Sequence, residues 1–432
     1  MKTRFAILVI LLVASTSTRA QVVPAATGPT GLPAGTLHYD LRFSQMTQFY
    51  GGSQSNSKSQ GDTTRLVASG EMTYSNSNGS RPFSVTYSGG DMWAISGYKG
   101  GSGVFQHMLI SQGILGKRWS ARVSDNVSYM PQAATTGFSG IPGVGDLPTP
   151  PSEPGGSILT LNTRSVRNAV NPSFTRRINF ATDFTVGGSY RIVRFPDGEG
   201  VDINQVQVNP GVSRRLDAFN SITGHYSFSR YTYPGLVYTT PNYSFSMQTQ
   251  SLMFGYTRMW NRRFRTTVSA GPQWVQPSDT QAVPSSVRPA VDASAAYSTR
   301  TTSFRVGYNQ GTSGGEGLIH QLGTHVYDFD ASISRQFGRN LTINGSGAYR
   351  RTQGYSVGGS STGKPQESSP INSPFGGISA TERLGRYFTL SGNYTAMHQS
   401  SQDQLPGNAV NGLVQVVGFS IGYNPRAKHL KK

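Results

Sequence analysis

The stretch SRQFGRNLTINGSGAYR, which runs from Ser334 to Arg350, most clearly decides the fold. Apolar and polar residues alternate along it, the alternation stops at Gly338-Arg339-Asn340, and it then resumes. A period of two is typical of a β-strand with one apolar and one polar face. The stretch therefore predicts two antiparallel strands joined by a short, basic turn.

Similar breaks recur along the chain. Seven short turns lie near residues 117, 176, 214, 262, 300, 339 and 386, and each has an aromatic or aliphatic residue beside it. Longer segments rich in Pro, Gly, Ser and Thr separate them, at residues 131–156, 234–242, 277–289, 310–321 and 353–374. Short turns that alternate with long loops are typical of outer-membrane β-barrels, in which the turns face the periplasm and the loops face outside.

The strand count follows from the turns. Seven turns define seven strand pairs, three more strands are expected at about residues 37–49, 64–74 and 82–88, and one at about 411–423. We therefore predict an all-β, antiparallel transmembrane β-barrel of about 16–18 strands, within a range of about 14–18. An even number places both termini of the chain on the periplasmic side.

The alternation also assigns the two faces of each strand. In TLHYDLRFSQ, Leu41 and Phe43 share one face, while Asp40 and Arg42 share the other. In a membrane barrel the apolar face meets lipid, because a charge at the bilayer midplane costs about 2–4 kcal/mol there. Charged side chains are therefore expected to line the lumen, and the candidates are Arg42, Arg122, Arg265, Arg305, Arg350, Asp40, Asp183 and Asp330.

The residues beside the short turns predict an aromatic girdle at one rim of the barrel, where neighbouring Arg side chains extend toward headgroups or water. The candidates are Trp119, Trp260, Phe264, Phe337, Leu341, Tyr387 and Phe388.

Residues 1–20 have the pattern of a secretory signal peptide. Lys2 and Arg4 precede an apolar run from Phe5 to Ala14, and Thr18-Arg19-Ala20 resembles a cleavage site. The run is shorter than the ~18 residues of a membrane helix. We expect a cleaved signal peptide at 1–20, an N-terminal segment at 21–35, one barrel domain at 36–424 and a basic tail at 425–432. An uncleaved anchor is the alternative.

The charge of the chain limits its partners. The formal net charge is +18, of which Lys2, Arg4 and Arg19 contribute three, and there is no cysteine, so export brings no disulfide framework. A basic chain can bind nucleic acid, anionic lipid or anionic solutes. Export and the lack of a nucleic-acid-binding motif argue against nucleic acid. The expected partners are outer-membrane lipid, lipopolysaccharide and small anionic solutes, and the oligomeric state stays open.

The last expected strand, LVQVVGFSIGY, carries a further signal. Gly418, Ile421 and Tyr423 resemble the Gly-x-x-apolar-x-aromatic ending that the barrel-assembly machinery reads, although Val416 replaces a polar residue and the tail NPRAKHLKK follows. With the leader, the SRxFGRN-type turns and the girdle, the mature chain resembles uncharacterised, porin-like outer-membrane β-barrel proteins of diderm bacteria. The resemblance implies a barrel in the bacterial outer membrane that the assembly machinery inserts, but no substrate and no functional residue.

Five cations against three anions among the lumen candidates predict a porin-like passive channel with a mild anion preference, because rings of Arg favour anions. Two alternatives stay open. The charges could instead pair inside a filled lumen, which would make the chain a non-conducting surface or structural barrel. It could also be a secreted, soluble all-β binding protein, such as a propeller of ~40-residue units.

Two motifs resemble chemical sites only in part. GGSSTGKP, at residues 358–365, has the spacing of a phosphate-binding loop, but Pro365 replaces the Ser or Thr that would hold Mg²⁺. In HQLGTH, His320 and His325 follow Glu316 without the helical spacing of a zinc site. No spacing indicates a catalytic triad or an acidic dyad. We therefore expect no enzymatic activity, no cofactor and no metal.

Overall fold

The computed structural model describes residues 35–51, 62–76, 79–97, 103–130, 164–197, 201–234, 245–280, 283–314, 321–356, 367–401, 411–425 and 428–430. In these ranges no helix is long and apolar enough to span a membrane. The strands are β1 Gly35–Gly51, β2 Thr63–Asn76, β3 Phe83–Ser96, β4 Gly103–Leu115, β5 Trp119–Met130, β6 Ser165–Arg177, β7 Thr182–Arg194, β8 Ile203–Arg215, β9 Asn220–Tyr233, β10 Phe245–Met259, β11 Phe264–Pro277, β12 Ser286–Ser298, β13 Thr302–Ser313, β14 Gln321–Phe337, β15 Leu341–Ser356, β16 Ile371–Leu384, β17 Phe388–Gln399, β18 Gly412–Tyr423 and β19 Lys428–Leu430.

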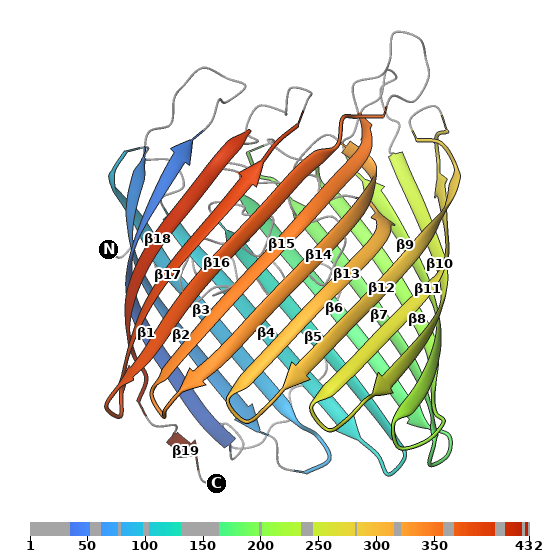
Figure 1. Cartoon of the computed structure of the whole chain (residues 1–432), viewed down its shortest axis with the longest axis horizontal. Coiled ribbons are helices and arrows are strands. Elements are labelled where there is room, and N and C mark those ends of the chain that lie inside the picture. Colours follow the sequence, from blue (N-terminus) through green and yellow to red (C-terminus); the bar gives the residue numbers. More distant parts are fainter. Residues whose placement is uncertain are drawn as a thin grey trace, which may run out of the picture.

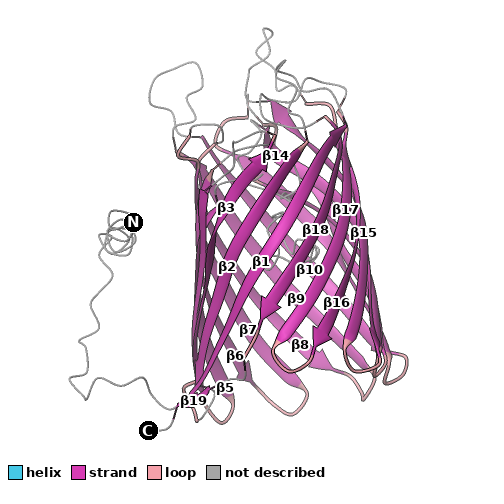
Figure 2. Cartoon of the chain, turned by 90° about the vertical axis from the view of Figure 1, so that its left-hand side faces the viewer, coloured by secondary structure: helices cyan, strands magenta, loops and turns pink. Residues whose placement is uncertain are grey.

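Strands β1 to β18 form one closed antiparallel sheet. Each pairs with the next along the chain, and β1 also pairs with β18, which closes the ring (Figure 1). The strands are tilted against the barrel axis (Figure 2). The prediction of an antiparallel barrel of about 16–18 strands is confirmed, and the closed barrel has 18. The soluble propeller alternative is wrong, because all these strands belong to a single sheet and not to separate blades.

The predicted basic tail contributes a short additional strand. In β19, Lys428, His429 and Leu430 pair with Leu37, Thr36 and Gly35 at the start of β1. This pairing extends the closing seam between β1 and β18 beyond Tyr423, where β18 ends.

The seven short turns lie together at one end of the barrel, and the longer connections lie at the other (Figure 1). Two turns lie a few residues later in the chain than predicted, because β6 continues to Arg177 and β8 to Arg215. In the turn after β14, Gly338 has φ of 63°, a left-handed conformation that favours glycine. Gly385 has the same role before β17, with φ of 69°.

Side-chain acceptors stabilise other short turns. After β10, Asn261 Oδ1 accepts the backbone N–H groups of Arg263 at 2.8 Å and Phe264 at 2.9 Å. After β8, Asp217 accepts the Asn220 side-chain amide and the Phe219 backbone N–H, and these hydrogen bonds hold the pKa of Asp217 below its usual value. Asx-type turns of this kind close short connections without Gly.

Several strands are longer than predicted, so the loops between them are shorter. Strand β3 extends to Ser96 rather than to residue 88, and β13 includes residues 310–313 of a predicted loop. Strands β15 and β16 include residues 353–356 and 371–374 of another. These segments contain Gly and small hydroxyl residues with weak alternation, so only their pairing with neighbours identifies them as strand.

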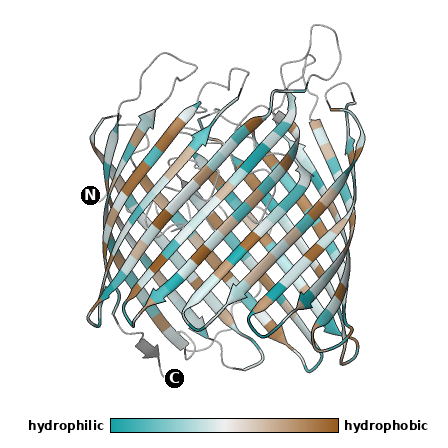
Figure 3. Cartoon of the chain, in the orientation of Figure 1, coloured by the Kyte–Doolittle hydropathy of each residue, from teal (hydrophilic) through white to brown (hydrophobic). Residues whose placement is uncertain are grey.

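The outer surface carries an apolar belt. Large apolar side chains such as Phe254, Val287 and Phe419 are 65%, 64% and 63% exposed. Hydrophobic and hydrophilic residues alternate along many of the strands (Figure 3). Trp119, Trp260, Phe337, Tyr387 and Phe388 are exposed beside the short turns, as expected for a girdle. Arg258 lies 4.2 Å above the Trp260 ring. A closed barrel with such a surface belongs in the outer membrane, where lipid covers the apolar side chains.

Some strand charges depart from the expectation that they face inward, among them Arg258, Arg335 and Asp125. Asp125 in β5 shares its face with the exposed Trp119 and Val123, so it points outward. Its Oδ1 accepts the Asn168 side-chain amide at 2.9 Å. The hydrogen bond lowers the cost of holding this carboxylate on the lipid-facing side.

Candidate functional site

The strand phases define an inner face of the barrel wall. In β1, Asp40 and Arg42 alternate with the exposed Leu41 and Phe43, and in β13, Arg305 follows the exposed Phe304. By the same alternation the remaining predicted side chains lie on the inner face of five further strands: Arg122 in β5, Asp183 in β7, Arg265 in β11, Asp330 in β14 and Arg350 in β15.

The predicted pair in β1 lies beside a cavity of about 420 Å³ whose lining includes His38, Ser88 and Phe105. Arg42 Nη2 is 3.9 Å from Asp40 Oδ2. Glu71 of β2 pairs directly with Asp40 across the strands and also lines the cavity. This part of the wall therefore combines one arginine with two carboxylates and does not itself favour anions.

Three other predicted arginines are accessible from the lumen. Arg122, Arg265 and Arg305 are exposed, although they lie on the inner face of a closed wall. Arg122 Nε donates to Ser111 Oγ at 2.8 Å. Among the described residues, neither Arg265 nor Arg305 forms an ion pair. Solvent therefore reaches the half of the lumen near the short turns, and the charges of Arg265 and Arg305 are not neutralised there.

Arg350 has a different environment. It is only 4% exposed, and its Nη2 lies 2.6 Å from Asp328 Oδ2 on the neighbouring strand β14. Asp183 is also paired, with Arg177 Nε 3.6 Å from its Oδ1 at the end of β6. The charge of Arg350 is therefore largely cancelled within the wall.

The sequence prediction missed other charges on the same face. Among them are Arg167, Arg191, Arg288, Glu71, Asp292 and Asp328. Asp328 lies two residues before the predicted Asp330, so extending the alternation along the whole of β14 would have found it. Arg167, Arg191 and Arg288 lie in strand halves near the long loops. Asp292 lies in the middle of β12, and Glu71 lies in the half of β2 nearer its connection to β3.

The ends of β13 and β14 near the long loops fold into the lumen. We call residues 311–314 and 321–326 the inward hairpin end. Gln273, on the inner face of β11, donates from Nε2 to the Thr312 carbonyl at 2.9 Å and accepts the Thr312 N–H at 2.7 Å. The Tyr233 hydroxyl of β9 donates to the Gly314 carbonyl. These contacts join β13 to strands that are not its neighbours in the wall.

A bend in β14 accompanies this fold. The register between β14 and β15 shifts between Leu322 and His325, and Gly323 has φ of 59°. A β-bulge with a left-handed glycine bends a strand out of its regular course. The prediction of an external loop at 310–321 is thus wrong for its described ends, which belong to the inward hairpin end.

Apolar side chains form two buried clusters on the inner face near the long loops. One cluster joins inner-face residues of β7 to β11, such as Tyr231, Phe245 and Met247, with Leu322 of the inward hairpin end. A second, on the opposite wall, includes Met46, Phe105 and Val414. The expectation of a polar inner face therefore holds near the short turns but fails near the long loops, where these side chains are buried and not wetted.

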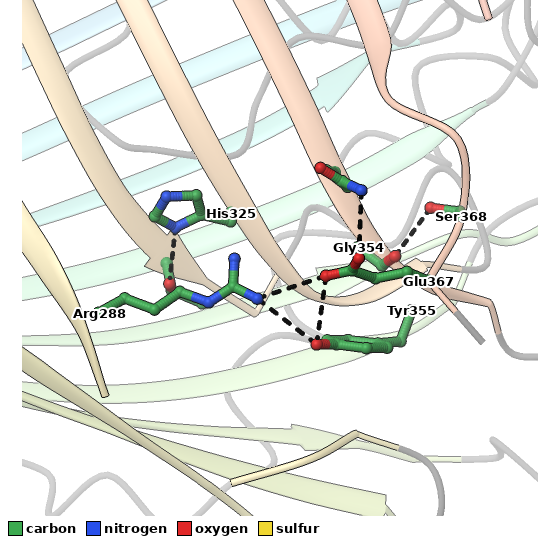
Figure 4. A network of polar contacts seen from close by, with 8 residues as sticks. Arg288, His325, Gly354, Tyr355, Glu367 and Ser368 are labelled. Carbon is green, nitrogen blue, oxygen red and sulfur yellow. Dashed lines mark hydrogen bonds and ion pairs between the residues drawn. The ribbon is translucent and has the colours of Figure 1, made fainter. Parts of the chain in front are cut away.

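Polar contacts join β12 to Tyr355 of β15 and to Glu367, and a separate contact lies within the inward hairpin end (Figure 4). Arg288 Nη2 lies 3.4 Å from Glu367 Oε1 and donates to the Tyr355 hydroxyl at 3.5 Å. His325 Nδ1 and the Thr312 hydroxyl are 3.0 Å apart. His320, Glu316 and residues 358–365 of the sequence motifs lie outside the described residues.

The comparisons with known proteins concern the fold. No family model matches the sequence, and no curated protein matches it significantly. Pseudomonas aeruginosa OccK2 (OpdF) is similar in structure, with 8% identity, a TM-score of 0.48, and coverage of 90% of this chain and 97% of that chain. Acinetobacter baumannii OccAB3 has 10% identity and a TM-score of 0.47, over 91% of this chain and 99% of that one.

Two further solved structures are similar to this chain. A BenF-like porin from Pseudomonas fluorescens Pf-5 shows 8% identity and a TM-score of 0.47, over 90% of this chain and 98% of that one. The FrpB iron transporter from Neisseria meningitidis shows 8% identity and a TM-score of 0.45, over 90% and 81%. By their names these are a porin and an iron transporter.

Proposed function

We propose that this protein is a porin-like passive channel with a mild anion preference. The observation that carries the proposal is the exposure of Arg122, Arg265 and Arg305 inside a closed wall. A barrel of this size leaves an aqueous channel unless something fills it. Exposed inner-face side chains are expected where water fills the lumen, and arginines at such positions attract anions.

The charge balance of the inner face supports the preference. Arginines outnumber carboxylates there. Two of the inner-face carboxylates form ion pairs, Asp40 with Arg42 and Asp183 with Arg177, so their negative charge is partly neutralised. Arg265 and Arg305 are then the side chains whose field reaches a passing solute. One carboxylate, Asp292, is exposed on the same part of the wall, which is why the preference is expected to be mild.

The narrow part of the path would lie near the long loops. The inward hairpin end and the two apolar clusters occupy that part of the lumen, so solutes have to pass beside them. The same observation supports a second candidate, a non-conducting barrel whose lumen is filled at this level. Signal-peptide cleavage, insertion by the barrel-assembly machinery and contact with lipopolysaccharide belong to both candidates as expectations.

Conductance of single proteins in planar lipid bilayers decides between the two. For the channel, we expect discrete conductance steps and, in a salt gradient, a reversal potential of the sign that anion preference gives. The preference should be strongest at low salt, because charges are screened over about 10 Å at 0.1 M. Folded protein that inserts, as judged by heat-modifiable migration in gels, but shows no steps would establish the filled barrel.

A further inference from the structure

The inner face of β12 to β15 carries a row of polar side chains that includes buried carboxylate and amide oxygens without hydrogen-bond donors. Asp292, Asn309, Asp328 and Arg350 pair directly with one another in sequence across four adjacent strands. Asp330 lies two residues from Asp328 on the same face of β14. The row thus brings three carboxylates and one amide together at one level of the wall.

Hydrogen bonding within the row cannot satisfy all its acceptors. Asn309 Nδ2 donates to Asp292 Oδ2 at 3.4 Å, so Asn309 Oδ1 faces the other neighbour, β14, where Asp328 is its direct partner. If the oxygen and nitrogen of the Asn309 amide were exchanged, the oxygen would face Asp292 and the nitrogen would face Asp328. In either orientation, one of the two carboxylates meets the amide oxygen of Asn309. Two acceptors that face each other need a shared proton or a cation between them.

Three oxygens of this group are sealed from solvent without a partner. They are Asn309 Oδ1, Asp328 Oδ1 and Asp330 Oδ2. Asp328 uses its other oxygen for Arg350, at 2.6 Å. Asp330 is 8% exposed and, among the described residues, forms neither a hydrogen bond nor an ion pair. Buried carboxylate oxygens without donors are rare in native proteins, and a bound cation is one way in which such oxygens are satisfied.

The carboxylate of Asp330 also has a defined direction. It lies against Gly307 of β13, where even a Cβ atom would collide with Asp330 Oδ1. Gly307 is the direct cross-strand partner of Asp330, and Asn309 is the next residue on the same face of β13. The absence of a side chain at Gly307 therefore lets the carboxylate lean toward β13 and the amide oxygen of Asn309.

Neither of the nearby arginines forms an ion pair with the Asp330 carboxylate. Arg305 and Arg350 both lie within electrostatic reach of it, as do Asp292 and Asp328. Arg350 is bound to Asp328, and Arg305 is exposed to the lumen without forming an ion pair among the described residues. The three carboxylates and two arginines leave one negative charge in excess, which a cation would offset.

We propose that Asn309, Asp328 and Asp330 form a binding site for a divalent cation of the Ca²⁺ type on the lumen wall. Ca²⁺ takes carboxylate and amide oxygens in flexible geometry and completes its shell with water. Among the described residues, no three His, Cys, Asp or Glu side chains converge on one metal position, so the protein supplies only two carboxylates and one amide oxygen. An affinity of about 10⁻⁴–10⁻³ M, as in extracellular calcium modules, is expected.

The test is calorimetric titration with CaCl₂ of the full chain refolded in detergent, a preparation that holds no lipopolysaccharide to bind calcium. We expect about one Ca²⁺ per chain. Asp330→Asn should weaken binding by about ten-fold or more, as expected when a metal site is altered. Gly307→Ala should also weaken it, because it displaces the Asp330 carboxylate without changing any charge. Asp217→Asn, which changes a carboxylate in an exposed turn, should bind as the wild type does.

A second readout covers variants that fold poorly. Ca²⁺ should raise the unfolding temperature of the wild type relative to EDTA and leave that of Asn309→Ala nearly unchanged. Absence of Ca²⁺ binding to the wild type would overturn the proposal and favour a proton shared between Asp330 and a neighbour. Wild-type affinity in both Asp330→Asn and Asn309→Ala would overturn it as well. Neither readout depends on conduction, so the site can be tested even in a barrel that does not conduct.

Discussion

Inner-face arginines of this barrel fall into two groups that the sequence alone does not separate. Arg265 and Arg305 are exposed to the lumen without an ion pair among the described residues, whereas Arg350 is 4% exposed and bound to Asp328. All three occupy the same phase of their strands. The difference comes from the neighbouring strand, because only β14 offers Arg350 a carboxylate as its direct cross-strand partner.

The exposed group should control ion selectivity. Replacing Arg265 and Arg305 by Gln should shift the reversal potential in a salt gradient toward cations, with little change in folding, because lumen positions tune selectivity more than stability. The shift should shrink as salt rises, since screening shortens the reach of the charges to about 3 Å at 1 M. Unchanged selectivity in a double variant that still conducts would show that other charges set the preference.

The buried group should control stability. Arg350→Gln leaves Asp328 buried without its cation, and breaking such a pair costs about 3–5 kcal/mol of the free energy of unfolding. Arg305→Gln, in β13 two strands earlier in the chain, is the matched control, and it should change stability by less than about 0.5 kcal/mol. Urea unfolding of the refolded barrel in lipid vesicles measures both. Equal stabilities for the two variants would mean that the Arg350–Asp328 pair is solvated in the membrane.

At the scale of elements, the inward hairpin end is the feature that distinguishes the two ends of the lumen. Gln273 anchors it from β11 through two hydrogen bonds to the Thr312 backbone, and Tyr233 anchors Gly314 from β9. These contacts are specific and directional, whereas the apolar cluster around Leu322 supplies burial without direction. The hydrogen bonds therefore determine where the hairpin end lies across the lumen.

Removing the anchor should widen or destabilise the narrow part of the path. Gln273→Ala removes both hydrogen bonds to Thr312, and a buried backbone group left unsatisfied costs about 1–3 kcal/mol. We expect larger and noisier single-channel conductance, because the hairpin end can then leave the lumen. Gln276→Ala is the control, since Gln276 is exposed on the outer face of the same strand. If both variants conduct like the wild type, the hairpin end does not limit the path.

The sequence was sufficient to predict the elements that repeat along the chain, but not the elements that occur once. Turns such as Gly338-Arg339-Asn340 combine a break in alternation with turn residues, so they were predicted, and with them the strand number. The inward hairpin end could not be predicted, because its Gly-rich residues at 311–314 look like an external loop and their partners, Gln273 and Tyr233, lie far away in sequence. Long-range contacts of this kind leave no local pattern.

At the scale of the whole molecule, the outer and inner faces of the barrel carry different kinds of side chain. Apolar side chains cover much of the outside of the closed wall, and charged and small polar side chains line the inside near the short turns. Near the long loops, two buried apolar clusters lie on the inner face beside charged residues such as Arg167 and Arg288. Closure through the β1–β18 pairing leaves no strand edge exposed to lipid among the described strands. The two ends of the barrel therefore differ in turn length, in charge and in how much of the lumen they leave open.

This asymmetry predicts an orientation in the membrane. Short turns face the periplasm in bacterial barrels and long loops face outside, so the turn at Asn340 should be hidden in intact cells and the connection at Ser285 should be accessible. Both residues are exposed in the structure, and the chain has no cysteine, so Asn340→Cys and Ser285→Cys each introduce a single thiol. A thiol reagent too large to pass the lumen should label Ser285→Cys in intact cells, and it should label both variants after the outer membrane is opened. Ser152→Cys and Ser361→Cys, in segments outside the described residues, should behave like Ser285→Cys. Labelling of Asn340→Cys alone in intact cells would mean that the barrel is inserted the other way up, and that the apolar, narrow end of the lumen faces the periplasm.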